Sequence, residues 1–334
     1  MELCALTIVL SLFWRSGHSL SPSFDVVVAK DGTGNFTTIG EAISAAPNYS
    51  SNGYHIKIKA GMYTENIVIG SCKTNLILIG DGMDDTRILG NRSFGSGFGT
   101  YDTATVGIHG QGFIAQGLSF ENLAGPKKGQ AVAVLVEANY TAFYRCRLKG
   151  YQDTLYTKIG EQFFRECEIF GTVDFIFGDA SVVFQNCIII ACRPLPQQYN
   201  TITAQGRELA PKQTGTVFHN CTITAAPDLR KQKRRFKTYL GRPWRLFSRT
   251  VIIQSFLDDI IDRKGWINWK GKKLGSPYYA EFKNRGPGAN TDGRVQWARV
   301  INSTEEAVAF TVRNFIHGEA WIPSTGIPFF PDLL

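Results

Sequence analysis

The chain has 334 residues, of which 43% are hydrophobic and 19% charged, a balance that excludes an intrinsically disordered protein. Its 36 Lys and Arg residues exceed its 28 Asp and Glu residues. The formal net charge of +8 suits a protein that meets polyanions: nucleic acid, anionic lipid or an acidic polysaccharide. Only five His residues are present, which argues against a His-rich metal site, and the many Gly and Phe residues favour a β-rich fold.

An apolar run lies at residues 3–13, and its 11 residues are too few to cross a bilayer. Small residues follow it, so we expect residues 1–21 to be a secretory signal peptide cleaved near Ser19 to Ser21. The alternative is a buried N-terminal element. No Pro- or Ser-rich linker divides the remainder, which we expect to be one domain over residues 22–334. Secretion agrees with six glycosylation triplets, at Asn35, Asn48, Asn91, Asn139, Asn220 and Asn302.

A short helix is predicted early in this domain. Thr38 and Glu41 form a capping-box pattern, in which each residue's side chain satisfies the other's backbone N–H. An alanine-rich segment follows and Pro47 stops it, so the helix ends before that residue.

Four similar segments then indicate an internal repeat. Each places Cys three residues after Phe, and they are Phe143–Cys146, Phe164–Cys167, Phe184–Cys187 and Phe218–Cys221. The cysteines are 21, 20 and 34 residues apart, and a weaker fifth copy is Phe113–Gln116. Between them lies a second row of strand-like runs: Ala104–Ile108, Gln130–Val134, Gln152–Tyr156, Val173–Phe177 and Thr201–Gln205.

Short β-rich segments at a period of 20 to 30 residues are typical of a stacked β-solenoid. We therefore predict an all-β parallel β-helix, in which Phe and Cys form internal ladders. A sandwich of antiparallel hairpins is the alternative, but it does not explain why similar residues recur in phase. The open ends of a solenoid need covers, since exposed strand edges aggregate.

The predicted cover at the C-terminal end begins at a second capping box, Ser303 to Glu306. It opens a short helix with Ala307 and Phe310 as apolar contacts. Residues 311–316 fit a helix less well, and an extended segment is the alternative there.

Four polar residues interrupt the second row of strands: Gln130, Gln152, Asp153 and Asp174. Gln130 and Gln152 are 22 residues apart, as are Gln152 and Asp174, so the solenoid brings all four onto one patch. Two adjacent carboxylates do not ionise together easily, so one serves as an acid and the other as a base or nucleophile. The Gln amides are donors for an oxyanion.

Arg242 lies in the segment Leu240–Trp244 and is the best candidate to hold one carboxylate ionised. Trp244 adds an aromatic face of the kind that packs on sugar rings. Each of these residues also has an ordinary interpretation: a strand-end cap for an Asp, an outward strand position for a Gln, a surface salt bridge for the Arg.

At these residues the sequence resembles plant pectinesterases (pectin methylesterases). The matching segments are Gly61–Glu65, Gln130–Val134, Gly150–Leu155, Gly171–Gly178, Asn200–Arg207, Leu240–Trp244 and Gly286–Ala289, in family order from about Asp25 to Phe329. The resemblance implies a right-handed parallel β-helix with short helices covering its ends. It also implies hydrolysis of the methyl esters of galacturonate in pectin, with release of methanol and with neither metal nor organic cofactor.

Carried over residue by residue, the resemblance makes Asp174 the nucleophile and Asp153 the general acid, then base. Gln130 and Gln152 would form the oxyanion hole, and Arg242 would hold Asp174. It further implies that Gln130, Arg242, Trp244 and Trp266 bind substrate, Trp266 having a core position as the alternative. A disulfide between Cys187 and Cys221 is implied too, while a Cys146–Cys167 bridge stays open.

The sequence departs from the family at two places near the site. Leu135 stands where relatives usually have a basic residue, and Lys158 stands near a common His. The chain resembles the short form without the N-terminal inhibitor-like region. We expect a secreted monomer of the cell wall that binds partly esterified pectin, and neither nucleic acid nor membrane. Binding of a proteinaceous inhibitor stays open.

Other functions remain to be weighed against this one. A serine hydrolase lacks support, because the chain has no G-x-S-x-G elbow and few His residues. Another β-helical pectin enzyme, a lyase or glycosidase, and a non-catalytic wall-binding protein are the alternatives. Residues 230–237 hold six basic residues in eight, which form either a solvated loop or a patch that attracts the acidic polymer.

Overall fold

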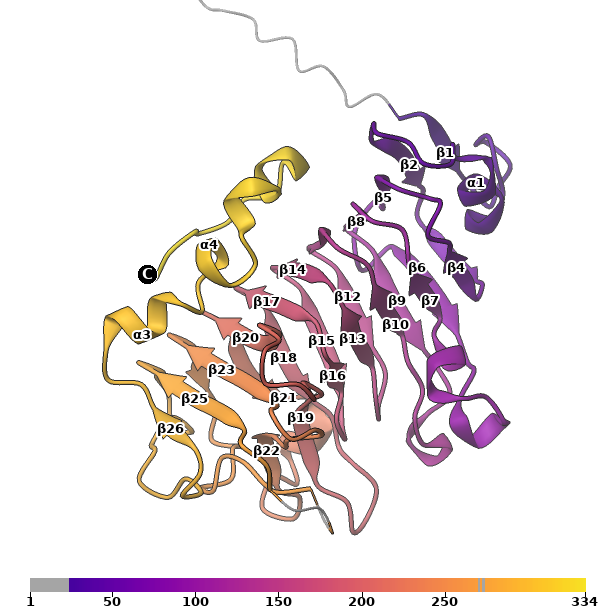
Figure 1. Ribbon diagram of the computed structural model, residues 1–334. Helices are drawn as coiled ribbons and strands as arrows, with labels where there is room; N and C mark the ends of the chain where they lie inside the picture. Colours follow the sequence, from indigo (N-terminus) through magenta and orange to yellow (C-terminus); the bar gives the residue numbers. More distant parts are fainter. Residues whose placement is uncertain (1–23, 270, 272–273) are drawn as a thin grey trace, which may run out of the picture.

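The computed structural model describes residues 24–269, 271 and 274–334, so the expected signal peptide at 1–21 lies outside the described residues. The chain winds as a right-handed parallel β-helix, in which each complete coil contributes one strand to each of three sheets (Figure 1). Neighbouring strands pair in parallel, one coil apart. The predicted fold is confirmed, and among the described residues no helix has the length and apolarity needed to cross a membrane.

The strands are named by sheet. Sheet A contains β1 Val26–Val28, β2 Tyr54–Ile58, β5 Leu76–Ile79, β8 Ile114–Gln116, β11 Thr141–Tyr144, β14 Glu161–Arg165, β17 Ser181–Gln185, β20 Gly215–His219, β23 Arg249–Ile253, β25 Tyr278–Phe282 and β26 Arg299–Val300. Sheet B contains β3 Gly61–Thr64, β6 Thr86–Gly90, β9 Ser119–Asn122, β12 Arg147–Lys149, β15 Glu168–Gly171, β18 Ile188–Ala191, β21 Thr222–Ala225 and β24 Phe256–Leu257. Sheet C contains β4 Ile67–Ile69, β7 Val106–Ile108, β10 Val134–Glu137, β13 Leu155–Ile159, β16 Ile176–Gly178, β19 Asn200–Gln205 and β22 Thr238–Gly241.

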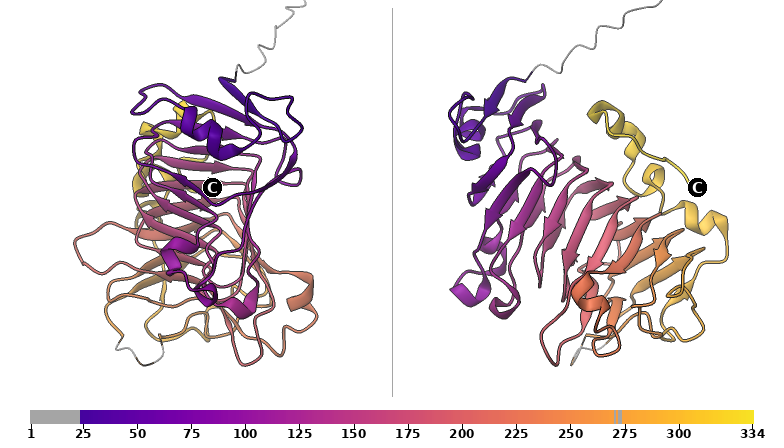
Figure 2. Two further views of the ribbon diagram at one scale, coloured as in Figure 1. Left: turned by 90° about the vertical axis from the view of Figure 1, so that its right-hand side faces the viewer. Right: turned by 180° about the vertical axis from the view of Figure 1, so that it is seen from behind.

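The helices are short. They are α1 Ile39–Ala45, α2 Pro227–Arg230, α3 Thr304–Val308 and α4 Val312–Phe315, with the 3-10 turns η1 Phe94–Ser96, η2 Thr100–Thr103, η3 Pro126–Lys128, η4 Gly318–Ala320 and η5 Ile322–Thr325. Helix α1 begins after Thr38, whose hydroxyl accepts the N–H of Glu41, as the capping box predicts. Its buried residues Ile39, Ala42 and Ile43 join the interior core, so α1 covers the N-terminal end of the coil stack (Figure 2).

The C-terminal helices do not cover the other end, and that part of the prediction is wrong. Helix α3 begins after Ser303 as expected, and residues 312–315 form α4 rather than an extended segment. Both helices pack on the outer face of sheet A, where Phe310 and Phe315 join a cluster with outward-facing side chains such as Phe163 (Figures 1 and 2). The residues of the C-terminal part of the chain that pack against the interior core are in the segment before α3, and they include Val295, Trp297 and Ala298.

The Phe ladder fills the interior in the predicted register. Phe143, Phe164, Phe184 and Phe218 are direct neighbours on successive strands of sheet A. Their ring centroids are 4.5, 4.8 and 5.1 Å apart. The weaker fifth copy was misplaced by two residues, because Phe143 pairs with Ala115 and not with Phe113.

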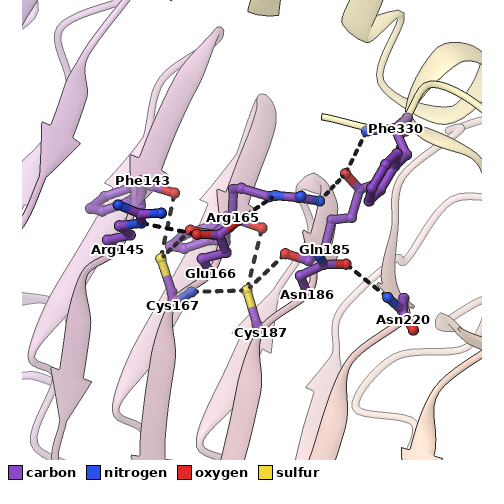
Figure 3. Close-up of polar contacts among 11 residues, drawn as sticks. Phe143, Arg145, Arg165, Glu166, Cys167, Gln185, Asn186, Cys187, Asn220 and Phe330 are labelled. Carbon is purple, nitrogen blue, oxygen red and sulfur yellow. Dashed lines mark hydrogen bonds and ion pairs between the residues drawn. The ribbon is translucent and has the colours of Figure 1, made fainter. Parts of the chain in front are cut away.

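The predicted Cys187–Cys221 disulfide is absent, since both residues are free thiols buried in the core. Each thiol donates to a backbone carbonyl one coil earlier: Cys187 to Phe164 and Cys221 to Phe184, both at 3.3 Å. Cys146 and Cys167 are also free. The bonds of Cys187 and Cys221 give each of these buried thiols a hydrogen-bonding partner without a covalent bridge. Figure 3 shows Cys167 and Cys187 in this row.

The C-terminal tail docks on sheet A through two glutamine amides that imitate the edge of a strand. Gln185 donates through Nε2 to the Phe330 carbonyl at 2.8 Å and accepts the Phe330 N–H through Oε1 at 2.9 Å (Figure 3). Gln254 pairs in the same way with both backbone groups of Leu334.

His219 is fully buried and joins these two amides. Its Nδ1 lies 3.1 Å from Gln185 Nε2, and its Nε2 lies 3.1 Å from Gln254 Oε1. Gln185 cannot turn its amide around, because its oxygen already accepts bonds from Phe330 and Arg165. Nδ1 must therefore accept and Nε2–H must donate, so the network needs a neutral imidazole. Burial lowers the pKa of His219, which acts in the same direction.

We predict that His219 makes stability depend on pH. The pKa of His219 is lower in the folded chain than the unfolded value of about 6.5, so the unfolded chain takes up the proton first. The free energy of unfolding then falls as the pH drops below about 6.5, until the folded pKa is passed. In His219→Gln this contribution is gone, so the melting-temperature gap between wild type and variant should narrow from pH 7.5 to pH 5 in calorimetry.

His55→Gln is the matched control, because His55 lies half-exposed on β2. A gap between wild type and His219→Gln that stays constant over this pH range would contradict the prediction.

Candidate active site

Sheet C carries the candidate site, and the four polar residues lie in the turns that precede its strands. Gln130 lies before β10, Gln152 and Asp153 before β13, and Asp174 before β16. The expectation that these residues lie within strands is therefore wrong, but the predicted register holds. Backbone hydrogen bonds join the three turns, from Ala131 N to the Gln152 carbonyl and from Asp153 N to the Val173 carbonyl, both at 3.1 Å.

The two aspartates have the same unusual backbone conformation. Asp153 and Asp174 adopt φ values of 62° and 51°, in the left-handed region that non-glycine residues rarely occupy. Such positions cost about 1–3 kcal/mol and cluster at functional sites. Stacked one coil apart, the two turns direct both carboxylates into the same cavity of about 400 Å³.

Asp174 is held by three side-chain hydrogen bonds. Arg242 donates through Nε to Oδ1 at 2.8 Å and through Nη2 to Oδ2 at 2.6 Å, a bidentate pair. The Thr201 hydroxyl also donates to Oδ1, at 2.6 Å. The predicted contact between Arg242 and Asp174 is therefore present, and it fixes the plane of the carboxylate.

Asp153 has the opposite environment. Its side chain is nearly buried, and burial together with repulsion from Asp174 raises its pKa well above the ordinary value. Arg242 opposes this shift but does not cancel it. The pair thus consists of one carboxyl group whose neutral form is favoured and one that is paired with Arg242, which is the division of roles expected of a general acid and a nucleophile or base.

Gln130 and Gln152 line the cavity beside the two aspartates, and both are half-buried. Among the described residues, neither side-chain amide has a hydrogen-bonding partner, so their N–H groups are available to a bound group. The turn that carries Gln130 is itself held in place, because its carbonyl accepts the N–H of Phe94 at 2.8 Å.

The aromatic part of the site differs from the prediction at one residue. Trp244 lines the cavity as expected, but Trp266 is fully buried in the core, with its ring 4.9 Å from that of Tyr279. Trp269 takes the predicted place, and the Arg242 guanidinium lies 3.9 Å from its ring centroid. Residues 266 and 269 are three apart in an extended segment, so their side chains point to opposite faces.

Other residues of the cavity were not singled out from the sequence. These residues are Thr100, Tyr101, Tyr156, Phe177, Ala204 and Trp269. Tyr156, Phe177 and Ala204 are register neighbours on the outer face of sheet C. Strand alternation counted from Asp153 and Asp174 would have placed Tyr156 and Phe177 on the opposite face, because the left-handed backbone of both aspartates interrupts the alternation. Thr201 lies in a segment that the resemblance includes, yet nothing in its spacing marked it as a partner of Asp174.

Half of the basic residues in segment 230–237 are neutralised by ion pairs. Three of its residues form ion pairs: Arg230 with Asp258, Lys233 with Asp259 and Lys237 with Asp262. In the part of the chain that the structure describes, the other three basic residues have no carboxylate in range: Lys231, Arg234 and Arg235. The segment is thus weaker as an anion-binding patch than its composition indicates. The described residues also contain no group of three or more His, Cys, Asp or Glu side chains placed to hold a metal ion.

Comparison with known proteins agrees with this geometry. A family model described as Pectinesterase matches residues 25–319. The chain is 52% identical over 311 residues to the pectinesterase/pectinesterase inhibitor PPE8B of Prunus persica, and the match covers 92% of this chain and 60% of that protein. The chain thus spans about three fifths of the length of the curated relatives it matches.

Solved structures give the same result. The fold matches pectin methylesterase from carrot with a TM-score of 0.93 at 44% identity, over 94% of this chain and 100% of that one. It also matches a pectin methylesterase mutant in complex with a hexasaccharide, with a TM-score of 0.74 at 25% identity, over 94% of this chain and 100% of the other.

We predict that replacing Trp266 lowers the free energy of unfolding much more than replacing Trp269, because only Trp266 lies in the core. Trp266→Ala should lower the free energy of unfolding by about 3–5 kcal/mol, because it leaves a large cavity in the core. Trp269→Ala should cost less than about half as much, because its side chain is half-exposed and less apolar surface is lost. Denaturant unfolding of both variants measures the difference, and equal losses would contradict these positions.

Proposed function

The chain belongs to the pectinesterase family, and on that premise we propose that it hydrolyses methyl esters of galacturonate units in pectin and releases methanol. One observation carries the proposal: Asp174 is bound in bidentate fashion by Arg242, while the buried Asp153 beside it has a raised pKa. This pairing supplies a nucleophile and an acid without a serine or a histidine.

In the first step, the Asp174 carboxylate attacks the ester carbonyl carbon, and the carbonyl oxygen becomes an oxyanion. The amide N–H groups of Gln130 and Gln152 donate to this oxyanion. The bond between the carbonyl carbon and the methoxy oxygen then breaks, and Asp153 transfers its proton to that oxygen as methanol leaves. The product is an anhydride between Asp174 and the galacturonate carboxyl group.

In the second step, Asp153 is a carboxylate and takes a proton from water as the water attacks the anhydride. Water adds to the galacturonate carbonyl carbon, the bond from that carbon to the Asp174 oxygen breaks, and Asp174 leaves as a carboxylate. One proton of the water stays on Asp153, which is protonated again, and the other goes to solvent as the galacturonic acid product ionises. Arg242 and Thr201 keep the Asp174 carboxylate oriented through both steps, since they bind its oxygens directly. Trp244 and Trp269 provide aromatic faces on which sugar rings pack.

The setting follows from the same premise. We propose that the protein is secreted to the cell wall, where the +8 charge attracts a polymer that becomes more acidic as its esters are removed. The signal peptide, N-glycosylation and a monomeric state stay predictions. The name of the Prunus persica relative joins a pectinesterase with a pectinesterase inhibitor. Whether a separate inhibitor protein binds this chain can be measured in a binding assay.

We predict that the purified protein releases methanol from highly esterified pectin and that Asp174→Ala reduces this rate at least about a thousandfold. Gln130→Ala and Gln152→Ala should each cost about 10²–10³, as lost oxyanion donors do. Asp292→Ala is the control, because Asp292 is exposed and lies outside the cavity.

Product analysis separates the alternatives in the same samples. New reducing ends without methanol would indicate a glycosidase, and unsaturated ends would indicate a lyase. Full methanol release by Asp174→Ala would overturn the mechanism, and binding of pectin without any product would favour a non-catalytic wall protein.

We predict an alkaline limb in the pH profile that belongs to Asp153. The first step needs protonated Asp153, and its raised pKa keeps it protonated above the usual range of an aspartate. The value of kcat/KM should therefore fall as the pH rises through this pKa. The limb should be missing in Asp153→Asn, whose small residual rate cannot depend on this proton, and a pH-independent wild type would contradict the assignment.

A further inference from the structure

A cluster of charged and aromatic side chains, Tyr101, His109, Glu137 and Lys158, lies at the edge of the active-site cavity and takes no part in the steps above. Tyr101 belongs to η2 and lines the cavity, while Glu137 and Lys158 belong to β10 and β13 of sheet C. We call these four residues the Tyr101 cluster. The family resemblance gives no role to any of them, and Lys158 is one of the two places where the sequence departs from its relatives.

Tyr101 makes three contacts within the cluster, and two further contacts hold Glu137. Its hydroxyl donates to Glu137 Oε2 at 2.8 Å, and Lys158 Nζ binds the other carboxylate oxygen at 2.6 Å. The same Lys158 Nζ lies 4.6 Å from the centroid of the Tyr101 ring. His109 Nδ1 lies 3.4 Å from Glu137 Oε2, and its ring centroid is 6.1 Å from that of Tyr101.

A backbone irregularity brings Lys158 to this place. Strands β10 and β13 pair regularly from Val134 to Val136, but Glu137 then pairs with Ile159, so Lys158 is an extra residue at a β-bulge. Bulges are rare between parallel strands, and they redirect side chains next to active sites. The bulge lets Lys158 reach Glu137 and the Tyr101 ring at once.

The loop that carries Tyr101 is fixed to the turn of the oxyanion donor. Phe94 N donates to the Gln130 carbonyl at 2.8 Å, and the Thr103 hydroxyl accepts the N–H of Val132 at 3.0 Å. Tyr101 therefore has a set position relative to Gln130. Burial and the bond to Glu137 raise the pKa of Tyr101 to about 12, so its hydroxyl stays a donor.

The charges on this side of the cavity compensate one another. Glu137 and Lys158 pair directly, Asp174 is paired with Arg242, and the raised pKa of Asp153 favours its neutral form. A free galacturonate carboxylate beside Tyr101 would bring an uncompensated negative charge close to Glu137 and Asp174. A methyl-esterified unit brings no charge and has an apolar face for the Tyr101 ring.

We propose that Glu137 and Lys158 are positioning residues that fix Tyr101 as a neutral wall of the cavity. This wall accepts a methyl-esterified galacturonate unit beside the reacting one and disfavours a free one. The proposal rests on the proposed esterase function and adds the residues that set its preference along the polymer.

The experiment measures methanol release on pectins of high and low ester content and separates KM from kcat. Glu137→Gln keeps an acceptor for the Tyr101 hydroxyl but leaves Lys158 unpaired, which adds a positive charge at this wall. The ratio of KM on low-ester to KM on high-ester pectin should fall about threefold, the size typical of one exposed or half-exposed charge interaction, with kcat changed less than about twofold. The double variant Glu137→Gln/Lys158→Met is neutral again and should return the ratio to that of wild type.

Two further variants complete the set. Tyr101→Ala should raise KM on high-ester pectin about five- to tenfold, as the loss of an aromatic contact does, while Tyr101→Phe keeps the ring and should rescue most of it. Glu166→Gln is the matched control, because it makes the same change of charge at an ion pair with Arg145 that lies outside the cavity.

The outcomes are distinct. KM values within twofold of wild type on both pectins for Glu137→Gln and Tyr101→Ala would overturn the proposal while the esterase function stands. The same holds if Glu166→Gln shifts the KM ratio as much as Glu137→Gln, or if the double variant keeps the shifted ratio. A wild-type protein that releases no methanol would instead overturn the proposed function itself.

Discussion

The parallel, in-register stacking of coils is the constraint on which the rest of this structure depends. Neighbouring strands lie about 4.8 Å apart, so residues about 21 positions apart in the chain become direct neighbours in space. The same geometry stacks Phe143 on Phe164 in the interior and places Asp153 one coil before Asp174 in the cavity outside sheet C. The core and the candidate site are therefore two faces of one repeat, and a change in coil length would misalign both.

This dependence explains which parts of the molecule the sequence predicted. Large residues that recur, such as Phe164 and Phe184, show which positions of successive coils are neighbours. That register predicted that Asp153 and Asp174 lie together, and the contact between Asp174 and Arg242 agrees with it. Where the coil length changes, the repeat misleads, as Phe113 shows by its offset from Phe143. The positions of strand starts were also missed, because Gln130 and Gln152 lie in turns whose backbone, and not their residue type, directs them into the cavity.

The remaining errors concern the direction in which a side chain points and the surface on which a helix packs. Trp266 and Trp269 lie in one short aromatic segment, and the sequence does not show which of the two side chains faces the core. In the structure the backbone of Trp266 pairs with that of Gly241, and the Trp266 side chain is the buried one. Helix α4 docks on sheet A because the outer face of that sheet is apolar. In the sequence this shows only as consecutive apolar residues such as Val182 and Val183, which place an apolar side chain on each face of the strand. The thiols of the Cys row had a partner that composition cannot reveal, namely a backbone carbonyl one coil away.

Charge is arranged on two scales in this protein, and the two have different consequences. The chain as a whole has a net charge of +8, which acts over a Debye length of roughly 8–10 Å and concentrates an acidic polymer near the surface. Inside the cavity the charges compensate one another, since Arg242 pairs with Asp174, Lys158 pairs with Glu137, and the raised pKa of Asp153 favours its neutral form. On the proposed function, long-range attraction brings the polymer in without regard to which units are esterified. Selection of the uncharged unit then falls to short-range contacts, where an uncompensated carboxylate costs more than it does in solvent.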